Sequence, residues 1–273
     1  MKVGVFDSGF GGLTVLRALM EQIPAADYVY LGDTARLPYG AKSRATVARY
    51  AVSSARFLVE QGAEFLVIAC NTASALALDA IRDAVPVPVL GVVETGANAA
   101  KANSATRDVL VMATAATVES HAYAAACAER GLRALEKACP LLVPLVEEGW
   151  IEHPVTAEVL RIYLSELAEQ AQAGGLQADT LVLGCTHYPL LRAQIERMVP
   201  GALPGSASGS LRVIDSAEVT AEQVRQKLGP GNGGRSPGTT RFFATDSVRK
   251  FQALGSRFLE RTITGVELVD LGG

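Results

Sequence analysis

Two cysteines stand where strand-like apolar segments give way to small polar residues. Cys70 closes the segment FLVIAC and is followed by Asn-Thr, whereas Cys185 closes TLVLGC and is followed by Thr-His. A cysteine at the turn from a strand into a helix lies near the first amide groups of that helix, which stabilise the thiolate and lower the thiol pKa from about 8.5. We therefore interpret both as reactive thiols, and Cys127 and Cys139 as buried structural residues.

His187 lies two residues after Cys185, and a neighbouring imidazole suits either thiolate activation or general acid–base work. A zinc site at this point is not expected, because no second Cys/His cluster would complete four ligands. One alternative is a Cys–His thiol hydrolase or amidotransferase built on Cys185 and His187, but that function leaves Cys70 unexplained.

The first strand-like segment ends in Asp7-Ser8-Gly-Phe-Gly-Gly, and an apolar helical stretch follows. Glycines in such a position let backbone amides approach an anion at a helix N-terminus. The spacing is not G-x-G-x-x-G, so a dinucleotide cofactor is only weakly indicated. Asp7 itself is either a helix cap or a catalytic carboxylate, and the residues alone do not separate the two.

Two further segments carry polar groups after expected strands. The loop DTARLPYG, residues 33–40, is rich in hydrogen-bonding groups and either binds something polar or makes a turn. Glu147 follows the run LLVPLV, which we expect to form a strand, and its carboxylate would then point into a cleft while Glu148 points elsewhere.

Apolar β-branched runs alternate with amphipathic stretches along the whole chain, which is typical of an α/β fold with parallel sheets. The expected strands are Val3–Phe6, Tyr28–Leu31, Phe65–Ala69, Val87–Val92, Asp108–Ala113, Leu141–Val146, Thr180–Leu183, Leu211–Ile214 and Arg241–Ala244. The clearest expected helices are Leu13–Met20, Arg44–Glu60, Ser120–Arg130 and Ala157–Ala173.

A weak internal repeat links two parts of the chain. FLVIACNT (Phe65–Thr72) matches TLVLGCTH (Thr180–His187), and GVFDSG (Gly4–Gly9) echoes RVIDSA (Arg212–Ala217). Ligands of such folds bind beyond the carboxyl ends of the strands. We therefore expect two similar doubly wound parallel-sheet domains that face each other across a cleft, with one cysteine from each.

Turn-rich residues gather in two places. The segment Gly201–Ser210 is a candidate interdomain crossing, and Gly229–Gly238 is a candidate surface loop.

Composition narrows the class of protein. The 273 residues are 49% hydrophobic and 19% charged, which is enough apolar material for a core and excludes a disordered chain. No apolar run reaches the roughly 18 residues of a membrane span.

The net charge of −3 and the scattered basic residues favour a small-molecule partner over nucleic acid or a membrane. The opening MKVGVFDSGFGG does not read as a secretory signal, so we expect a cytoplasmic protein with reduced thiols; this counts against a secreted solute-binding module.

Taken together, the motifs resemble those of the cofactor-independent branch of the aspartate/glutamate racemase superfamily. The matching segments, in family order between residues 4 and 217, are GVFDSGFGGLTVL, LGDTARLPYG, IACNTAS, LVPLVEEG, LGCTHYPLL and VIDSA. The resemblance implies two α/β domains, residues 1–96 with 212–273 and residues 97–211. It also implies racemisation of glutamate to supply D-glutamate for peptidoglycan synthesis, with aspartate or broader amino-acid specificity as the alternative, no metal, and a possible homodimer.

The resemblance also assigns roles by position. Cys70 and Cys185 would be the two acid/base residues, Asp7 would assist Cys70, and His187 and Glu147 would assist Cys185. Ala113 stands where the family usually has a glycine, before two threonines that would contact substrate. The implied substrate-binding residues are Asp7, Ser8, Tyr39, Gly40, Asn71, Thr72, Thr114, Thr117, Thr186 and His187.

Overall fold

A computed structural model of the chain describes residues 1–202, 211–229 and 237–272. They form two compact units, Met1–Val92 with Ala217–Gly273 and Val93–Ser216. The chain therefore passes between units after Val92 and after Ser216, whereas we expected crossings after residues 96 and 211. Both turn-rich segments expected near residues 201–210 and 229–238 fall largely outside the described residues.

The first unit contains a six-stranded sheet in the order β10-β9-β2-β1-β3-β4, and every neighbouring pair is parallel. Its strands are β1 (Lys2–Asp7), β2 (Asp27–Gly32), β3 (Phe65–Ile68), β4 (Val89–Gly91), β9 (Thr240–Ala244) and β10 (Val266–Leu268). Its helices are α1 (Leu13–Gln22), α2 (Arg44–Glu60), α3 (Asn71–Ala84), α10 (Ser216–Leu228) and α11 (Val248–Leu259), with short 3-10 turns η1 (Thr34–Arg36) and η2 (Tyr39–Ala41).

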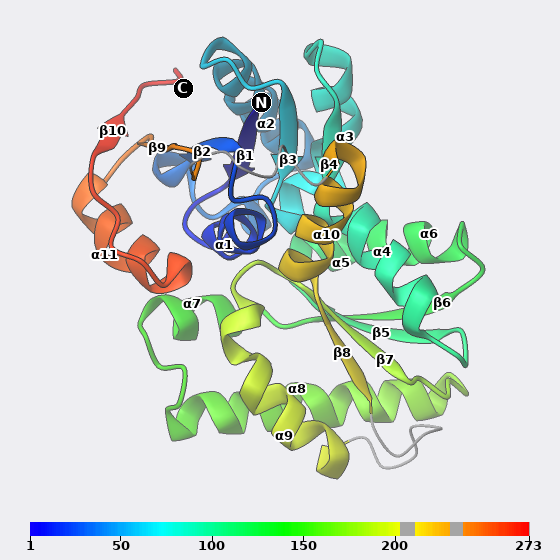
Figure 1. Cartoon of the computed structure of the whole chain (residues 1–273). Helices are drawn as coiled ribbons and strands as arrows, with labels where there is room; N and C mark the ends of the chain where they lie inside the picture. The colour runs from blue at the N-terminus through cyan, green and yellow to red at the C-terminus, as the bar shows by residue number, and fades with distance from the viewer. Residues whose placement is uncertain (203–210, 230–236, 273) are drawn as a thin grey trace. The chain divides into compact units, whose positions relative to one another are not determined.

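Helices cover both faces of this sheet (Figure 1). Phe6, Leu31 and Ile68 share one buried cluster with apolar residues of α2 and α3. On the opposite face Tyr30 contacts Phe251 of α11, with ring centroids 5.9 Å apart. Strands buried on both faces explain why their sequences are continuously apolar rather than alternating.

The second unit contains a four-stranded parallel sheet in the order β6-β5-β7-β8. Its strands are β5 (Asp108–Ala113), β6 (Arg133–Ala138), β7 (Thr180–Gly184) and β8 (Arg212–Asp215). Its helices are α4 (Val92–Asn103), α5 (Ala115–Glu119), α6 (Ala122–Ala128), α7 (Leu142–Glu147), α8 (Pro154–Ala173) and α9 (Arg192–Ala202), with the 3-10 turn η3 (Tyr188–Leu191). In Figure 1, α8 and α9 run along one face of this sheet. The expected pair of doubly wound parallel sheets is confirmed, and β8 belongs to the second sheet although we expected Arg212 onward in the first domain.

One expected strand is wrong. Leu141–Val146 is largely helical and forms most of α7, in which Leu142 and Val146, four residues apart, are buried while Leu141 is 55% exposed. This spacing follows a helical period, which a short apolar run does not reveal. The strand at that edge of the sheet is instead Arg133–Ala138, a half-buried segment with charged side chains that lacks an apolar run.

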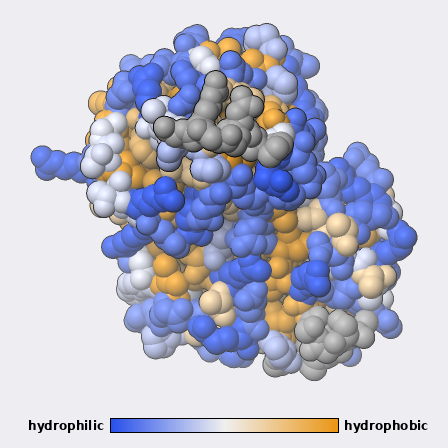
Figure 2. Space-filling view, viewed as in Figure 1, coloured by the Kyte–Doolittle hydropathy of each residue, from blue (hydrophilic) through white to orange (hydrophobic). Residues whose placement is uncertain are grey.

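Hydrophilic residues cover much of the face of each unit seen in Figure 2. Among the described residues, no helix is both long and apolar enough to cross a lipid bilayer.

Candidate active site

The internal repeat corresponds to the same strand pairing in both units. Cys70 follows β3, which pairs with β1, the strand that ends in Asp7. Cys185 follows β7, which pairs with β8, the strand that ends in Asp215. Because paired parallel strands end at the same edge of a sheet, each unit places a cysteine beside an Asp-Ser turn.

Asp7 is a buried carboxylate at the edge of the first sheet. It is 1% exposed, and its Oδ2 accepts a hydrogen bond of 2.8 Å from the amide of Gly9. The helix-cap interpretation is wrong, because Gly12 precedes α1 and no side chain caps that helix. A Cβ on Gly12 would lie 2.5 Å from the Cβ of Asp7 and 3.0 Å from that of Ala69. Glycine at this position therefore lets α1 begin against Asp7.

Cys70 occupies the N-cap position of α3. Its Sγ accepts a hydrogen bond of 3.4 Å from the amide of Ala73, and its thiol donates to the Ser8 hydroxyl at 3.4 Å. Burial and the neighbouring charge of Asp7 raise the pKa of Cys70 to about 12, although hydrogen bonds with Ser8 and Ala73 act in the opposite direction. The expected lowering of this pKa is wrong, because desolvation of the thiolate outweighs the helix amides. Cys70 is a thiol at neutral pH.

The raised pKa of Cys70 has a measurable consequence. Since only the thiolate is alkylated, we expect carbamidomethylation of Cys70 by iodoacetamide to accelerate about tenfold per pH unit from about pH 7 to about pH 9, with no plateau. Peptide mapping by mass spectrometry follows Cys70 alone, and glutathione in the same tube is the control thiol that does approach a plateau. A plateau of the Cys70 rate at or below the pH of the glutathione plateau would show that the pKa is not raised.

Cys185 belongs to a chain of contacts in the second unit. Its Sγ lies 3.9 Å from His187 Nδ1, and His187 Nε2 lies 3.2 Å from Glu147 Oε1. Burial alone lowers the pKa of His187, but hydrogen bonds to Cys185 and Glu147, together with their charges, raise it to about 10. His187 is therefore an imidazolium at neutral pH, held between a sulfur and a carboxylate.

Glu147 is the last residue of α7, so a helix and not a strand brings its carboxylate to His187. The neighbouring Glu148 is exposed to solvent. The helical turn thus separates two adjacent glutamates that the sequence alone hardly distinguished.

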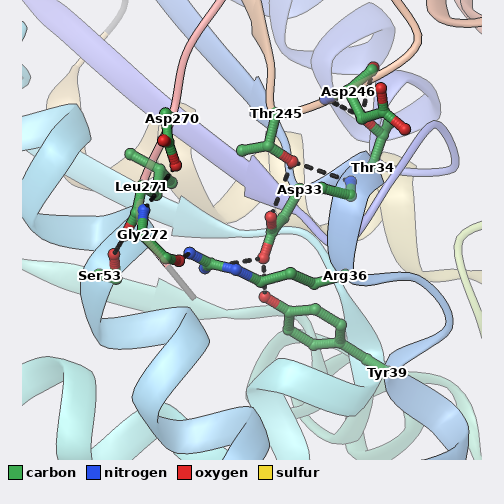
Figure 3. Close-up of polar contacts among 11 residues, drawn as sticks. Asp33, Thr34, Arg36, Tyr39, Ser53, Thr245, Asp246, Asp270, Leu271 and Gly272 are labelled. Atoms are coloured by element: carbon green, nitrogen blue, oxygen red, sulfur yellow. Dashed lines mark hydrogen bonds and ion pairs between the residues drawn. The ribbon is translucent and has the colours of Figure 1, made fainter.

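Tyr39 and Gly40 lie in the turn η2. The side chain of Tyr39 points toward the buried carboxylate of Asp33 (Figure 3). The Tyr39 hydroxyl donates a hydrogen bond of 2.5 Å to Asp33, which is fully buried. Burial and the charge of Asp33 raise the pKa of Tyr39 well above its usual value. The Tyr39 hydroxyl is thus committed to Asp33, so a ligand contact made by this turn would go through its backbone.

The predicted threonines lie at helix starts. Thr114 precedes α5, and its hydroxyl lies 2.9 Å from that of Thr117 and accepts from the Thr117 amide at 3.4 Å. Among the described residues, the non-glycine residues with positive φ are Arg107, His121, Ser247 and Glu260. Ala113 is therefore accommodated at the end of β5 without a glycine conformation.

Asn71, Thr72 and Thr186 are also buried next to their cysteines, the first two in the first turn of α3. The Thr186 hydroxyl lies 3.5 Å from His187 Nδ1.

Three supporting residues had no role in the sequence analysis. Asp33 and Arg36 belong to a loop recognised only as polar, and Tyr188 lies inside the motif LGCTHYPLL. The Tyr188 hydroxyl donates to the carbonyl oxygens of Cys139 at 2.9 Å and Ala113 at 3.2 Å, and so fixes the turn after Cys185 to the ends of β5 and β6. In the sequence, Tyr188 directly follows the predicted site residues Cys185, Thr186 and His187, and this position was the signal that could have indicated its supporting role.

Comparison with known proteins places the chain in a family. A model of the Asp/Glu/Hydantoin racemase family matches residues 3–224. The chain belongs to this family. Among the residues that the structure describes, no group of three or more His, Cys, Asp or Glu side chains is arranged to hold a metal ion.

Individual relatives within the family match over nearly the full chain. A glutamate racemase of Koribacter versatilis is 51% identical, with 99% of this chain and 98% of that protein covered. A glutamate racemase of Syntrophus aciditrophicus is 44% identical over 98% of this chain and 96% of that protein. The crystal structure of glutamate racemase from Francisella tularensis in complex with D-glutamate matches with a TM-score of 0.85 at 33% identity, covering 99% of this chain and 97% of that one.

Proposed function

We propose that this protein interconverts L- and D-glutamate without a cofactor, using Cys70 and Cys185 as paired acid and base. The observation that carries the proposal is that each unit ends a core strand in a buried cysteine with its own polar support. Ser8 and Asp7 support Cys70, and His187 and Glu147 support Cys185. Full-length relatives named as glutamate racemases support the choice of substrate.

Inversion at an α-carbon needs a base on one face and an acid on the other. In the proposed reaction one sulfur removes the α-proton, and the other cysteine donates its own proton to the opposite face of the carbanion. Two thiols suit the task because either can serve as acid or base, so both directions run at one site. The proposal requires that the ends of β3 and β7 approach the same carbon from opposite sides.

Without a cofactor as electron sink, positioned hydrogen bonds must stabilise the developing negative charge. His187 is a cation with its Nδ1 3.9 Å from the sulfur of Cys185, so its positive charge lies on the Cys185 side of the proposed site. The remaining contacts to the two substrate carboxylates would come from Ser8, Asn71, Thr72, Thr114, Thr117, Thr186 and the backbone of Tyr39 and Gly40.

The raised pKa of Cys70 bears on the role that this residue takes first in the proposed mechanism. Cys70 is a thiol, because its pKa is raised to about 12, and is therefore the acid. For Cys70 to act as the base in the opposite direction, its thiol must first lose its proton.

We further propose that the reaction supplies D-glutamate for peptidoglycan synthesis. The proposed location is the cytoplasm, where both thiols stay reduced. The homodimer stays a prediction.

The proposal is tested by incubating the purified protein with L-glutamate and EDTA and no added cofactor. We expect D-glutamate to accumulate until the two enantiomers are equal, because enantiomers have equal free energies, and chiral chromatography measures the ratio. L-aspartate is the matched control substrate, for which we expect kcat/KM to be at least about tenfold lower, since one missing methylene shifts its side-chain carboxylate. Activity that EDTA abolishes and a metal restores would overturn the mechanism, and equal use of aspartate would overturn the specificity.

A further inference from the structure

The last described residues of the chain lie along α2. This C-terminal tail, Val269–Gly272, begins directly after β10 with a hydrogen bond of 3.0 Å from the Val269 amide to the Ala244 carbonyl. Val269 and Leu271 pack against the buried cluster beneath α2, and the Leu271 carbonyl accepts a hydrogen bond of 3.3 Å from the Ser53 hydroxyl. The tail is thus a fixed part of the first unit.

Arg36 joins the tail to the buried Asp33 (Figure 3). One guanidinium nitrogen donates to the Gly272 carbonyl, and the other lies 3.3 Å from Asp33 Oδ2. The guanidinium also stacks on Tyr50 of α2, 4.5 Å from the ring centroid. The planar guanidinium presents separate donors to the two acceptors while its face stacks on the ring, a combination that the compact ammonium of lysine does not offer.

Asp33 in turn contacts Tyr39, which lies with Gly40 in the turn η2. Its Oδ2 accepts the Tyr39 hydroxyl, and its Oδ1 accepts the Thr245 hydroxyl at 2.9 Å. Thr245 Oγ1 also accepts from the Ala35 amide at 2.9 Å. The loop Asp33–Ala41 is therefore anchored at two points, by the segment after β9 and by the C-terminal tail through Arg36.

We propose that the C-terminal tail and Arg36 position the loop Asp33–Ala41 for binding of the substrate carboxylate. This inference rests on the proposed function, in which Tyr39 and Gly40 contact glutamate. Because the Tyr39 hydroxyl is bonded to Asp33, the loop acts through backbone groups, whose placement depends on the anchors of the loop. Arg36 is a positioning residue, since it acts on the ligand only through Asp33 and Tyr39.

Hydrogen exchange of the ligand-free protein tests the anchor directly. Two variants interrupt it: Arg36→Met, which keeps an apolar side chain on Tyr50, and a deletion of residues 269–273. In both we expect faster exchange of the Arg36 and Lys42 amides, which bond to the carbonyls of Asp33 and Tyr39 in the wild-type protein. The Ala35 amide is the internal control, because the Thr245 anchor still holds it.

Steady-state kinetics provide the functional arm. We expect each variant to raise KM for glutamate about tenfold with kcat within about twofold, because the loop binds the substrate and transition state alike. The double variant should be no worse than the more impaired single variant, because in this proposal the tail acts on the loop only through Arg36. Arg49→Met is the matched control, since Arg49 stacks on the same Tyr50 ring at 5.3 Å and is expected to leave KM unchanged.

The two arms separate this inference from the proposed function. If the wild-type protein does not racemise glutamate, the proposed function fails while hydrogen exchange still decides whether the tail anchors the loop. Unchanged loop exchange in Arg36→Met, additive KM effects, or an equal effect of Arg49→Met would each overturn the inference. Thermal unfolding shows whether the variant that lacks residues 269–273 folds. If it does not, the comparison of Arg36→Met with Arg49→Met, in loop exchange and in KM, decides the question alone.

Discussion

Replacement of Cys70 or Cys185 by alanine is expected to reduce net inversion of glutamate by about a thousandfold, because each variant lacks the proton carrier on one face. Positioned acid–base groups contribute about 10²–10⁴-fold to such steps. Residues that act as a unit lose nearly their whole contribution when one is removed, so the double variant should be about as slow as either single variant. Circular dichroism at one wavelength follows the approach to the racemate.

Exchange of the α-proton in deuterated water distinguishes the two cysteines. A single variant can still exchange the enantiomer whose proton faces the surviving sulfur, with retention of configuration. We therefore expect Cys70→Ala and Cys185→Ala to show opposite enantiomer preferences. The same preference in both variants, or inversion near the wild-type rate in either, would exclude a mechanism with two bases.

Cys127→Ala is the matched control for both experiments. Cys127 is a fully buried cysteine of α6, and its pKa is raised to about 11 chiefly by burial. The Cys127→Ala substitution removes another buried thiol from the second unit, and we expect it to leave both the inversion rate and the enantiomer preference of α-proton exchange unchanged.

The parts of the fold and site that could be predicted from sequence have a common physical basis. A parallel strand buried on both faces must be apolar throughout, so the segments before Cys70 and Cys185 indicated strands without further information. The carboxyl ends of neighbouring strands meet at one edge of a sheet, so the repeat placed both cysteines where a ligand can bind. Both predictions depend on local sequence and one general rule of topology.

The predictions that were wrong or missing depend on contacts distant in sequence. Whether Leu141–Val146 forms a strand or a helix depends on the competing strand Arg133–Ala138, whose half-buried edge position hides its apolar pattern. The direction of the Cys70 pKa shift depends on how completely the fold excludes water from the sulfur. The contact of Arg36 with Gly272 joins residues more than two hundred positions apart. None of these is encoded by a short motif.

In the Glu147→Gln variant, we expect kcat/KM for racemisation to begin its fall on the alkaline side of the pH profile at a lower pH than in the wild-type protein. The Glu147 carboxylate favours the charged imidazolium of His187, whose pKa is raised from 6.5 to about 10 by Cys185 and Glu147 against the effect of burial. Removal of one negative charge at 3.2 Å lowers that pKa by about one to three units while it leaves a hydrogen-bond acceptor in place. Below about pH 6 both proteins hold a protonated His187, so the difference in kcat/KM between them should grow as the pH rises toward about 10.

Two measurements separate this electrostatic role from a loss of structure. The imidazole proton resonances of the three histidines report the His187 pKa without substrate, and His187→Asn identifies the signal by its disappearance. Glu148→Gln removes the same charge from the adjacent exposed residue and should leave the alkaline side of the pH profile and the resonance unchanged. If Glu147→Gln lowers activity equally at every pH, with no movement of the His187 titration, then Glu147 does not act through the charge of His187. In that case the imidazolium would have to be held by Cys185 alone, and Cys185→Ala should lower the same pKa further than Glu147→Gln does.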